Sequence, residues 1–408
     1  MKKVLFAIPT LRGGGAERVV ARLAGQLCQQ HEVHIATFAR GLEGAYDTDP
    51  RITLHELVPA RSQFKPYTLA YGFLPISRWR DLHNLKRSLG IDVCASFLTD
   101  SNQDNIYSRA GERTVVSIRN TLAPVYELDP LRRMRELIRI KDAAQNADAI
   151  VAVTHGAAIE QVEFFGADPS RVSVIHNYVD ACDLRAQAQE PLDVEEFKRF
   201  REEHDLVVIA AGRRDPQKAH WHLIRAFREV RSQMNVGLVI LGAGVEWKYA
   251  QLVEANGLSK DVLLPGFSRH VPSYLAQCDL FVSPSLFEGL SNVMLEAMAI
   301  GLPIVSTDHP TDAREVLAPS LDPAPAQGPE LAEFGVLSPQ LSGNQNLCDG
   351  PLEPAEHQLA QTLLLMLGSP ELRERYGRLA ELRVRDFAPE KIVAQWAEVL
   401  QVPWEPGA

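Results

Sequence analysis

Two successive series of short apolar runs, each alternating with helix-length segments, constrain this chain more than any other feature. The first series lies before residue 190 and consists of 4–8, 33–38, 93–97, 114–118 and 149–153. The second begins with the run 206–211. Such alternation is typical of parallel sheets covered by helices on both faces. At 408 residues the chain also exceeds what one core usually holds. The sequence therefore predicts an α/β protein with two doubly wound domains.

We expect the domains to span 1–190 and 191–388. Residues 389–408 should pack back on the first domain, because Ile392, Trp396, Val399 and Leu400 share one helical face. Residues 318–355 are rich in Pro, Gly, Ala and Gln and predict an irregular excursion.

Composition excludes several classes of protein. A net charge of −10 argues against nucleic-acid binding. The five cysteines are scattered, which favours reduced thiols and excludes a zinc site built from them. The apolar run at the N-terminus ends at Pro9, too early for a signal peptide, and no run of about 18 apolar residues occurs. We therefore predict a cytoplasmic protein.

One stretch of the first half is basic although the whole chain is acidic. Residues 61–141 hold 14 basic and 8 acidic residues, with Phe64, Tyr67, Tyr71, Phe73 and Trp79 among them. Within this stretch, 131–144 predicts an amphipathic helix with several arginines beside its apolar face. Two interpretations stay open. The helix lies on an anionic membrane, or its apolar face packs on the core as in any surface helix.

The strongest motif is the segment 287–305, which follows the apolar run 280–283. Glu288 comes at the carboxyl end of that predicted strand, where open α/β sheets bind ligands. Ser291 or Asn292 would cap the next helix, whose first N–H groups suit a diphosphate. Glu296 lies about one turn inside, and its carboxylate is able to accept hydrogen bonds from ribose hydroxyls.

Other loops suit the same ligand. Gly13, Gly14 and Gly15 follow the first predicted strand and let backbone amides approach an anion closely. Arg213 and Lys218 follow the run 206–211, so two cations are available to offset the charge on a departing diphosphate.

These segments resemble, in order and spacing, glycosyltransferase family 4, whose members are retaining enzymes of the GT-B fold. The segment 288–296 is similar to the family's E-x7-E motif. Further matches are 13–18, 172–180, 212–218, 264–267 and 334–337. The resemblance implies two Rossmann-like domains facing a central cleft, with the acceptor on the first and the nucleotide on the second.

The resemblance also assigns roles. The catalytic residues would be Arg213, Lys218 and Glu288. The donor would be bound by Gly14, Gly15, Arg213, Lys218, Gly242, Phe267, Glu288, Ser291, Asn292, Val293 and Glu296. The acceptor would be bound by Glu17, Arg119 and Asn120.

Arg119 and Asn120 are a departure, because many family members have a histidine there. Either residue is able to bind sugar hydroxyls or an acceptor phosphate, and neither is a general base near neutral pH. In the family, the leaving phosphate itself is thought to act as the base.

We therefore expect a retaining transferase that moves a hexose or N-acetylhexosamine from a UDP-sugar to a glycan acceptor. The segment 308–317 resembles members that build bacterial surface polysaccharide or lipopolysaccharide. The acceptor would be linked to polyprenyl diphosphate, and the enzyme would lie on the inner face of the plasma membrane.

No cofactor or metal is expected. Asp47-Thr48-Asp49 imitates a metal motif of another fold, but it precedes Pro50 and is interpreted as a turn. His220 and His222 have no third ligand in view. Two alternatives remain: a sugar-nucleotide epimerase or hydrolase, and a non-catalytic nucleotide-sugar-binding protein.

Overall fold

The computed structural model describes residues 1–12, 14–39, 48–57, 74–122, 125, 128–309, 311–320 and 324–405. The chain divides into two compact units, one formed by Met1–Tyr178 with Pro389–Ala408 and the other by Val179–Ala388. Within the described parts of the chain, no helix is long and apolar enough to cross a bilayer.

The first unit contains a sheet of seven parallel strands in the order β3-β2-β1-β4-β5-β6-β7. Its strands are β1 (Lys3–Ile8), β2 (Glu32–Thr37), β3 (Thr53–Glu56), β4 (Val93–Phe97), β5 (Arg113–Ile118), β6 (Ala149–Ala152) and β7 (Val172–Val174). Strand β1 lies in the interior of the sheet, since Val4 pairs with Val33 on one side and with Val93 on the other.

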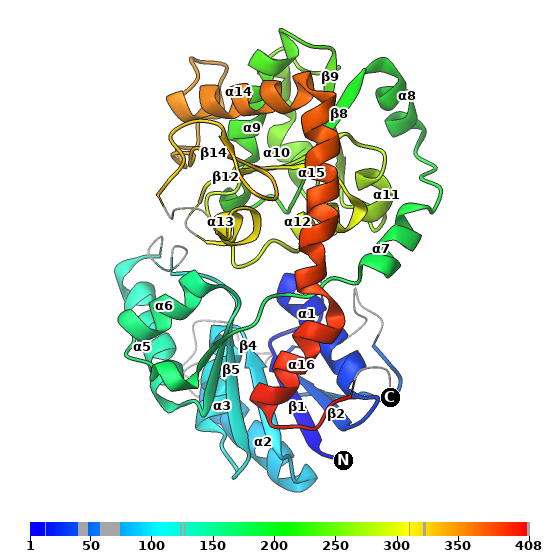
Figure 1. Cartoon of the computed structure of the whole chain (residues 1–408). Helices are drawn as coiled ribbons and strands as arrows, with labels where there is room; N and C mark the ends of the chain where they lie inside the picture. Colours follow the sequence, from blue (N-terminus) through cyan, green and yellow to red (C-terminus); the bar gives the residue numbers. More distant parts are fainter. Residues whose placement is uncertain are drawn as a thin grey trace. The chain divides into compact units, whose positions relative to one another are not determined.

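The helices of this unit are α1 (Gly15–Leu27), α2 (Leu74–Leu89), α3 (Thr99–Tyr107), α5 (Pro130–Asn146), α6 (His155–Glu163) and α16 (Pro389–Leu400). Figure 1 shows α16, in red, beside α1 and the strands of this sheet. The Trp396 ring is buried and stacks on Phe97, with the ring centroids 5.5 Å apart. Burial of this apolar face joins the last helix to the first unit, although more than 200 residues separate them in sequence.

The second unit repeats the plan, with strand order β10-β9-β8-β11-β12-β14-β13. Its strands are β8 (Leu206–Ala211), β9 (Val236–Leu241), β10 (Val262–Gly266), β11 (Leu280–Ser283), β12 (Ile304–Thr307), β13 (Glu330–Leu331) and β14 (Val336–Ser338). Only β13, at one edge of this sheet of described strands, is antiparallel to its neighbour.

The helices of the second unit are α7 (Ala181–Ala188), α8 (Glu195–Glu203), α9 (His220–Arg231), α10 (Val245–Ala255), α11 (Val271–Leu275), α12 (Asn292–Ile300), α13 (Asp312–Leu317), α14 (Pro354–Gly368) and α15 (Pro370–Arg383). Two short 3-10 helices, η3 (Pro216–Lys218) and η4 (Val384–Phe387), also belong to it. Helix α14 packs on α9, and the two helices enclose a buried Glu356 that accepts from Arg225 and lies 2.7 Å from His222 Nδ1.

The structure differs from the sequence expectation at several places. Strands β3 and β7 of the first sheet were not among the predicted apolar runs. The first unit ends at Tyr178 rather than at 190, because α7 packs on α11 and α12 and the Arg185 side chain donates to the Ala299 carbonyl. The segment 318–355 is not wholly irregular, since β13 and β14 lie in it. Strand β14 is buried and extends the sheet beside β12.

The strand order reverses once in each sheet. Strands β1 and β4 are neighbours in the first sheet, and β8 and β11 are neighbours in the second. At such a reversal the loops that follow the two strands run to opposite sides and leave a crevice at the carboxyl ends. Each unit therefore has one place where its fold favours a ligand.

Candidate functional site

Glu288 and Lys218 meet at the strand reversal of the second unit. Lys218 follows β8 and Glu288 follows β11, and Lys218 Nζ lies 2.6 Å from Glu288 Oε1. Gln217 Nε2 donates to Glu288 Oε2 at 2.8 Å, and Ser285 Oγ donates to Oε1 at 2.6 Å. The pair is largely buried. Its hydrogen-bond partners come from both loops, so both loops hold its geometry. The sequence pointed to Glu288 and Lys218 but not to Gln217 or Ser285.

Glycines let the loops after β8 and β9 approach each other. A Cβ on Gly242, whose φ is +150°, would lie 1.8 Å from the Gly212 carbonyl oxygen. Gly242 N–H donates to the Gly266 carbonyl at 2.8 Å, which ties in the end of β10. A Cβ on Gly212 would lie 2.8 Å from Lys218 Cδ, so the lysine side chain lies across this glycine. The glycines thus shape the surface beside the ion pair.

The two arginines after β8 differ. Arg213 is exposed, whereas the Arg214 guanidinium lies 3.6 Å from the centroid of the Trp247 ring. Phe267, after β10, is also exposed, at 68%. Both arginines are exposed, and Arg214 differs in that its guanidinium is engaged in a stacking contact.

Helix α12 begins beside Glu288. Ser291 is its N-cap residue, but the Ser291 side chain accepts no capping hydrogen bond and its hydroxyl is buried without a partner among the described residues. Asn292 and Val293 form the first turn and are half-buried. Glu296 follows within the same helix and is buried. An N-terminus without a side-chain cap is suited to binding an anion.

The loop between β12 and α13 holds this segment at both ends. Glu288 N–H donates to Thr311 Oγ1 at 3.1 Å, and Ser291 N–H donates to Asp312 Oδ2 at 2.6 Å. His309 joins the two, with Nδ1 2.6 Å from Thr311 Oγ1 and Nε2 3.3 Å from Asp312 Oδ1. In the sequence analysis, the segment 308–317 was noted only because it resembles the corresponding segment of family members. A polar run directly after a strand was the signal that would have found these residues.

Burial sets the charge of this loop. Burial, together with the nearby Glu288 carboxylate, raises the pKa of Asp312 to about 8. Burial also lowers the pKa of His309 to about 4. At neutral pH both groups are therefore uncharged, and Glu288 keeps Lys218 as its one described cationic partner.

The residues expected from the first unit lie in two places. Gly14 caps α1 and Gly15 is its first residue. Glu17 accepts from Thr10 Oγ1 at 3.1 Å, and its carboxylate leaves no room for a Cβ on Gly14. Gly13 lies outside the described residues.

Arg119 and Asn120 follow β5 and differ in exposure. Asn120 is exposed, whereas Arg119 is buried and donates to Asn177 Oδ1. The Arg119 guanidinium also lies over the Phe97 ring, and burial lowers its pKa to about 10. Of the two, Asn120 therefore presents the more accessible side chain.

The described histidines and aspartate that were considered as metal ligands are either paired with other side chains or buried. Asp49 accepts from the Arg51 backbone and side chain, and Asp47 lies outside the described residues. His220 is buried, and burial lowers its pKa to about 3. His222 lies against Glu356. The expectation that no metal is needed stays a prediction.

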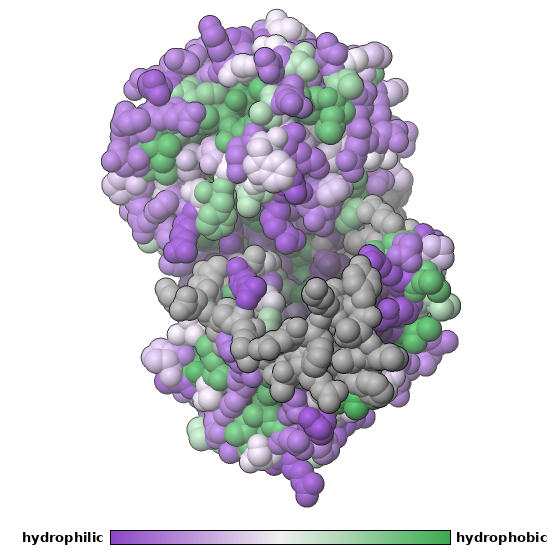
Figure 2. All heavy atoms as spheres, turned by 180° about the vertical axis from the view of Figure 1, so that it is seen from behind, coloured by the Kyte–Doolittle hydropathy of each residue, from purple (hydrophilic) through white to green (hydrophobic). Residues whose placement is uncertain are grey.

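Helix α5 carries an apolar face that the core does not cover. Leu131, Met134 and Ile138 are 70%, 53% and 51% exposed, while Leu137 packs toward the core. Met134, Leu137, Ile138 and the neighbouring Phe164 border an apolar groove. In Figure 2, apolar side chains (green) lie beside hydrophilic ones on the side that carries α5 and α6. Leu131, Met134 and Ile138 therefore do not fit the interpretation in which the apolar face of this helix packs on the core.

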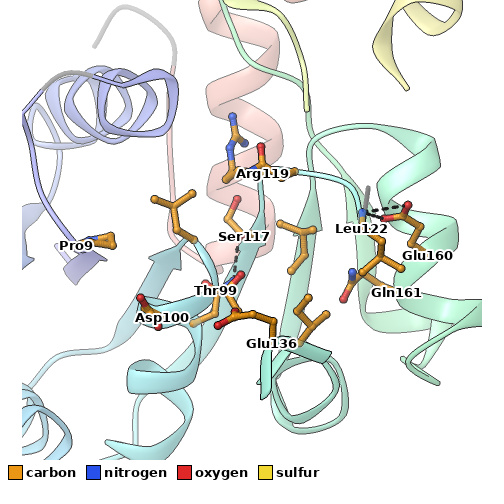
Figure 3. Close-up of a pocket in the computed structure, with 14 residues that line it drawn as sticks. Pro9, Thr99, Asp100, Ser117, Arg119, Leu122, Glu136, Glu160 and Gln161 are labelled. Carbon is orange, nitrogen blue, oxygen red and sulfur yellow. Dashed lines mark hydrogen bonds between the residues drawn. The ribbon is translucent and has the colours of Figure 1, made fainter. Parts of the chain in front are cut away.

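Helix α5 also lines a pocket, with Glu136 and Ile140. This cavity of about 330 Å³ lies where the chain leaves β1, β4 and β5, and Arg119 and Asn120 border it as well. Figure 3 shows Arg119 and Glu136 together with Gln161 of α6. Two of the residues predicted to bind the acceptor therefore lie at the strand reversal of the first unit.

Much of the basic surplus of residues 61–141 is used within the unit. Arg78 pairs with Asp104, Lys86 lies in a buried pair 2.7 Å from Glu112, and Arg139 pairs with Asp100 and Glu136. Trp79 stacks on Tyr107 instead of lying free on the surface. Phe64, Tyr67, Tyr71 and Phe73 lie outside the described residues. Arg132, Arg135 and Lys141 remain exposed along α5.

Comparisons with known proteins agree with this geometry. Residues 13–182 match the family described as Glycosyltransferase Family 4, and 205–326 match Glycosyl transferases group 1. A Campylobacter jejuni protein, N-acetylgalactosamine-N,N'-diacetylbacillosaminyl-diphospho-undecaprenol 4-alpha-N-acetylgalactosaminyltransferase, is 28% identical over 396 residues, 96% of this chain and 97% of its own.

Two further similarities cover different extents. The Escherichia coli UDP-Gal:alpha-D-GlcNAc-diphosphoundecaprenol alpha-1,3-galactosyltransferase is 33% identical over 144 residues, 34% of this chain and 37% of its own. The crystal structure of Anabaena HepE in complex with UDP and glucose has a TM-score of 0.74 at 19% identity. It covers 98% of this chain and 100% of that one.

The two reversing sheets and these similarities define a glycosyltransferase of the GT-B fold, with two Rossmann-like domains. The chain belongs to glycosyltransferase family 4.

Replacing Gly242 by alanine should lower the free energy of unfolding by about 2–3 kcal/mol more than Gly257→Ala does. Both glycines have positive φ, but a Cβ on Gly257 meets no heavy atom within 4 Å. The comparison therefore isolates the clash with Gly212 from backbone strain. Urea denaturation measures both variants, and equal losses would mean that the loops after β8 and β9 separate freely.

Asp312→Asn should change how stability depends on pH. The folded pKa of Asp312 lies above its unfolded value, so its contribution is present at low pH and is lost as pH rises toward 8. The lowered pKa of His309 has the opposite effect, which ends near pH 6.5. Between pH 6.5 and 8 only the Asp312 contribution of the two changes.

In that window the stability of the native chain should fall relative to Asp312→Asn by up to about 1.4 kcal/mol per pH unit. Denaturation at several pH values measures the difference. The exposed Asp183→Asn serves as control and should leave the slope unchanged. A constant difference between the native chain and Asp312→Asn would show that Asp312 is ionised throughout.

Proposed function

We propose that this glycosyltransferase transfers a hexose or N-acetylhexosamine from a UDP-sugar, with retention of configuration, to a glycan linked to polyprenyl diphosphate. Such a step would serve the assembly of bacterial surface polysaccharide or lipopolysaccharide. The names of the Campylobacter and Escherichia relatives include diphospho-undecaprenol acceptors, and the structurally similar Anabaena protein holds UDP and glucose. These similarities support the proposal, and the site geometry supplies its mechanism.

The observation that carries the proposal is the cationic edge at the strand reversal of the second unit. Exposed Arg213 and the α12 N-terminus, which has no side-chain cap, follow the neighbouring strands β8 and β11. Negative charge grows on the leaving diphosphate during transfer, so fixed positive groups stabilise the transition state more than the bound donor. Lys218, already paired with Glu288, acts by holding that carboxylate in place.

The remaining contacts that we propose with the donor follow from where the residues lie in the second unit. The N–H groups of Asn292 and Val293 would bind the diphosphate, and Glu296 in the same helix would accept from the ribose. Gly242 and exposed Phe267 would border the nucleobase. We further propose that no divalent metal is needed, because Arg213 and the helix dipole supply the positive charge.

Arg213→Ala should lower kcat by about 100-fold, because one positive group facing the leaving diphosphate is lost. The neighbouring Arg214→Ala, whose guanidinium stacks on Trp247, should change kcat little. Mass spectrometry of transfer from a panel of UDP-sugars to polyprenyl-diphosphate glycans, run in EDTA, measures both.

Three results would contradict parts of this proposal. A raised KM with unchanged kcat in Arg213→Ala would mean that the arginine only binds the donor. Release of free sugar without transfer would identify a hydrolase. Activity that appears only after magnesium or manganese is added would overturn the metal-free mechanism.

We also propose that α5 docks the enzyme on the anionic inner face of the plasma membrane, where a lipid-linked acceptor lies. The apolar Leu131, Met134 and Ile138 are exposed beside three exposed cations, Arg132, Arg135 and Lys141. Apolar side chains entering the interface and cations meeting anionic headgroups are the two contributions that hold amphipathic helices on membranes. Arg132 also lies 3.3 Å from Asp129, but 76% of its side chain is exposed. Arg139, by contrast, is 19% exposed and pairs with both Asp100 and Glu136, so Arg139 is not counted.

Replacing Arg132, Arg135 and Lys141 by glutamine should weaken binding to anionic vesicles by about 100-fold, since each cation contributes about 1 kcal/mol. Co-sedimentation measures it, and binding by the native chain should fall as salt rises. A matched control replaces exposed Lys198, Arg199 and Arg378 of the second unit and removes the same charge. If both triple variants sediment alike, α5 is not the docking surface.

A further inference from the structure

Two buried titratable groups beside Glu288 have no part in the mechanism proposed above. They are Asp312, which is fully buried, and His309, which is 1% exposed. Asp312 is the first residue of α13, and His309 lies in the loop that joins β12 to it. Burial of ionisable groups costs free energy, so a pair that is kept beside a binding site is a candidate for a role in that site.

The Asp312 side chain holds the residue at which α12 begins. Its Oδ2 accepts the Ser291 N–H at 2.6 Å, and Ser291 is the N-cap residue of α12. Because the Ser291 side chain makes no capping hydrogen bond, the contact with Asp312 fixes how the chain enters the helix. The direction of α12 at this end sets where its first N–H groups point, and these groups are proposed to bind the donor diphosphate.

The same carboxyl group reaches Glu288 through His309 and Thr311. Thr311 Oγ1 accepts the Glu288 N–H at 3.1 Å and lies 2.6 Å from His309 Nδ1. His309 Nε2 in turn lies 3.3 Å from Asp312 Oδ1. One buried chain of contacts therefore joins the Glu288 backbone to the start of α12.

A neutral carboxyl group fits both contacts of Asp312. With the His309 proton on Nδ1, where Thr311 Oγ1 accepts it, Nε2 is an acceptor and needs a hydrogen from Asp312. A carboxylic acid donates that hydrogen from Oδ1 and accepts the Ser291 N–H with Oδ2, whereas a carboxylate has no hydrogen to donate. The raised pKa of Asp312, about 8, and the lowered pKa of His309, about 4, favour the same neutral pair.

The charged groups around this pair come from four segments of the second unit. Glu288, after β11, is paired with Lys218, after β8. Asp308, after β12, is paired with Arg314 of α13. Each of these two carboxylates has a cation as partner, so an ionised Asp312 would add an uncompensated negative charge within the described part of the unit. That charge would lie at the N-terminus of α12, where an anion is to bind.

We infer that Asp312 is a positioning residue, which as a neutral acid holds the start of α12 and the Glu288 loop in the arrangement that binds the donor diphosphate. The inference rests on the proposed function and adds the group that sets the geometry of its donor site. Loss of the Asp312 proton removes the hydrogen that His309 accepts and adds a negative charge near the diphosphate. Donor binding should therefore weaken as pH rises through about 8.

Calorimetric titration of the full chain with UDP at pH 7 and pH 9 tests the inference. The affinity should fall about tenfold, because the neutral fraction of a group that titrates near pH 8 falls from about 0.9 to about 0.1. Asp312→Asn keeps an acceptor for Ser291 and a donor for His309 but does not titrate, so it should not show this fall. Asp312→Ala lacks both contacts and should bind UDP about tenfold more weakly than Asp312→Asn at pH 7. Exposed Asp183→Asn is the control and should behave as the native chain does.

A second readout is the proton uptake that accompanies binding, obtained from titrations in two buffers of different ionisation enthalpy. At pH 8 the native chain and Asp183→Asn should each take up about half a proton as UDP binds, because binding favours the neutral acid. Asp312→Asn should take up none. A residue that only stabilised the fold would not change this quantity.

The outcomes separate the role of Asp312 from the proposed reaction. An equal fall in affinity for the native chain and Asp312→Asn overturns the inference, even if sugar is transferred from UDP-sugars. If ADP or GDP binds and UDP does not, the proposed donor is wrong, and the same variants titrated with that nucleotide decide the inference. Absence of binding by all three nucleotides to the native chain overturns both. Urea denaturation reports folding, and if Asp312→Ala does not fold, the pH dependence and proton uptake of Asp312→Asn decide.

Discussion

The reversal of strand order within each sheet is the constraint on which both candidate sites depend. Strands β8 and β11 are adjacent although more than 60 residues separate them in sequence, so the loops that follow them meet at one edge. Lys218 and Glu288 come from those two loops and pair there. The pocket of the first unit occupies the corresponding position after β1 and β4. Parallel sheets direct all their carboxyl ends to one edge, which is why unrelated side chains converge at these points.

Two neighbouring carboxyl groups of the second unit, those of Glu288 and Asp312, differ in their surroundings. Lys218, Gln217 and Ser285 all donate to the Glu288 carboxylate, so it is stabilised as an anion within the second unit. Asp312 is buried near the Glu288 carboxylate, and both its burial and this negative charge raise its pKa. Glu288 therefore accepts hydrogen bonds from three side chains, whereas burial keeps the neighbouring Asp312 a neutral acid at neutral pH.

The first unit divides its charges in a comparable way. Arg78, Lys86 and Arg139 form ion pairs within the unit. A count of basic residues therefore overstates the positive charge of its surface. Three of the cations that remain exposed, Arg132, Arg135 and Lys141, lie on α5 beside the exposed apolar side chains of that helix. A surface of this composition suits a lipid interface, whereas the pocket that α5 lines with Glu136 and Ile140 holds carboxylates, neutral polar groups and Arg119.

The sequence by itself determined the fold class, most strand positions and the ends of strands at which Arg213, Lys218 and Glu288 lie. Apolar periodicity and glycine positions are local, so they are readable without coordinates. The short strands β3, β7, β13 and β14 were not predicted, because strands of two to four residues show too little periodicity. Only the tertiary structure decided that Thr311 and Asp312 hold the Glu288 loop, that Arg139 is neutralised, and that Leu131, Met134 and Ile138 stay exposed. Those properties depend on which distant residues become neighbours, and burial of a charge or a side chain is a property of that assembly.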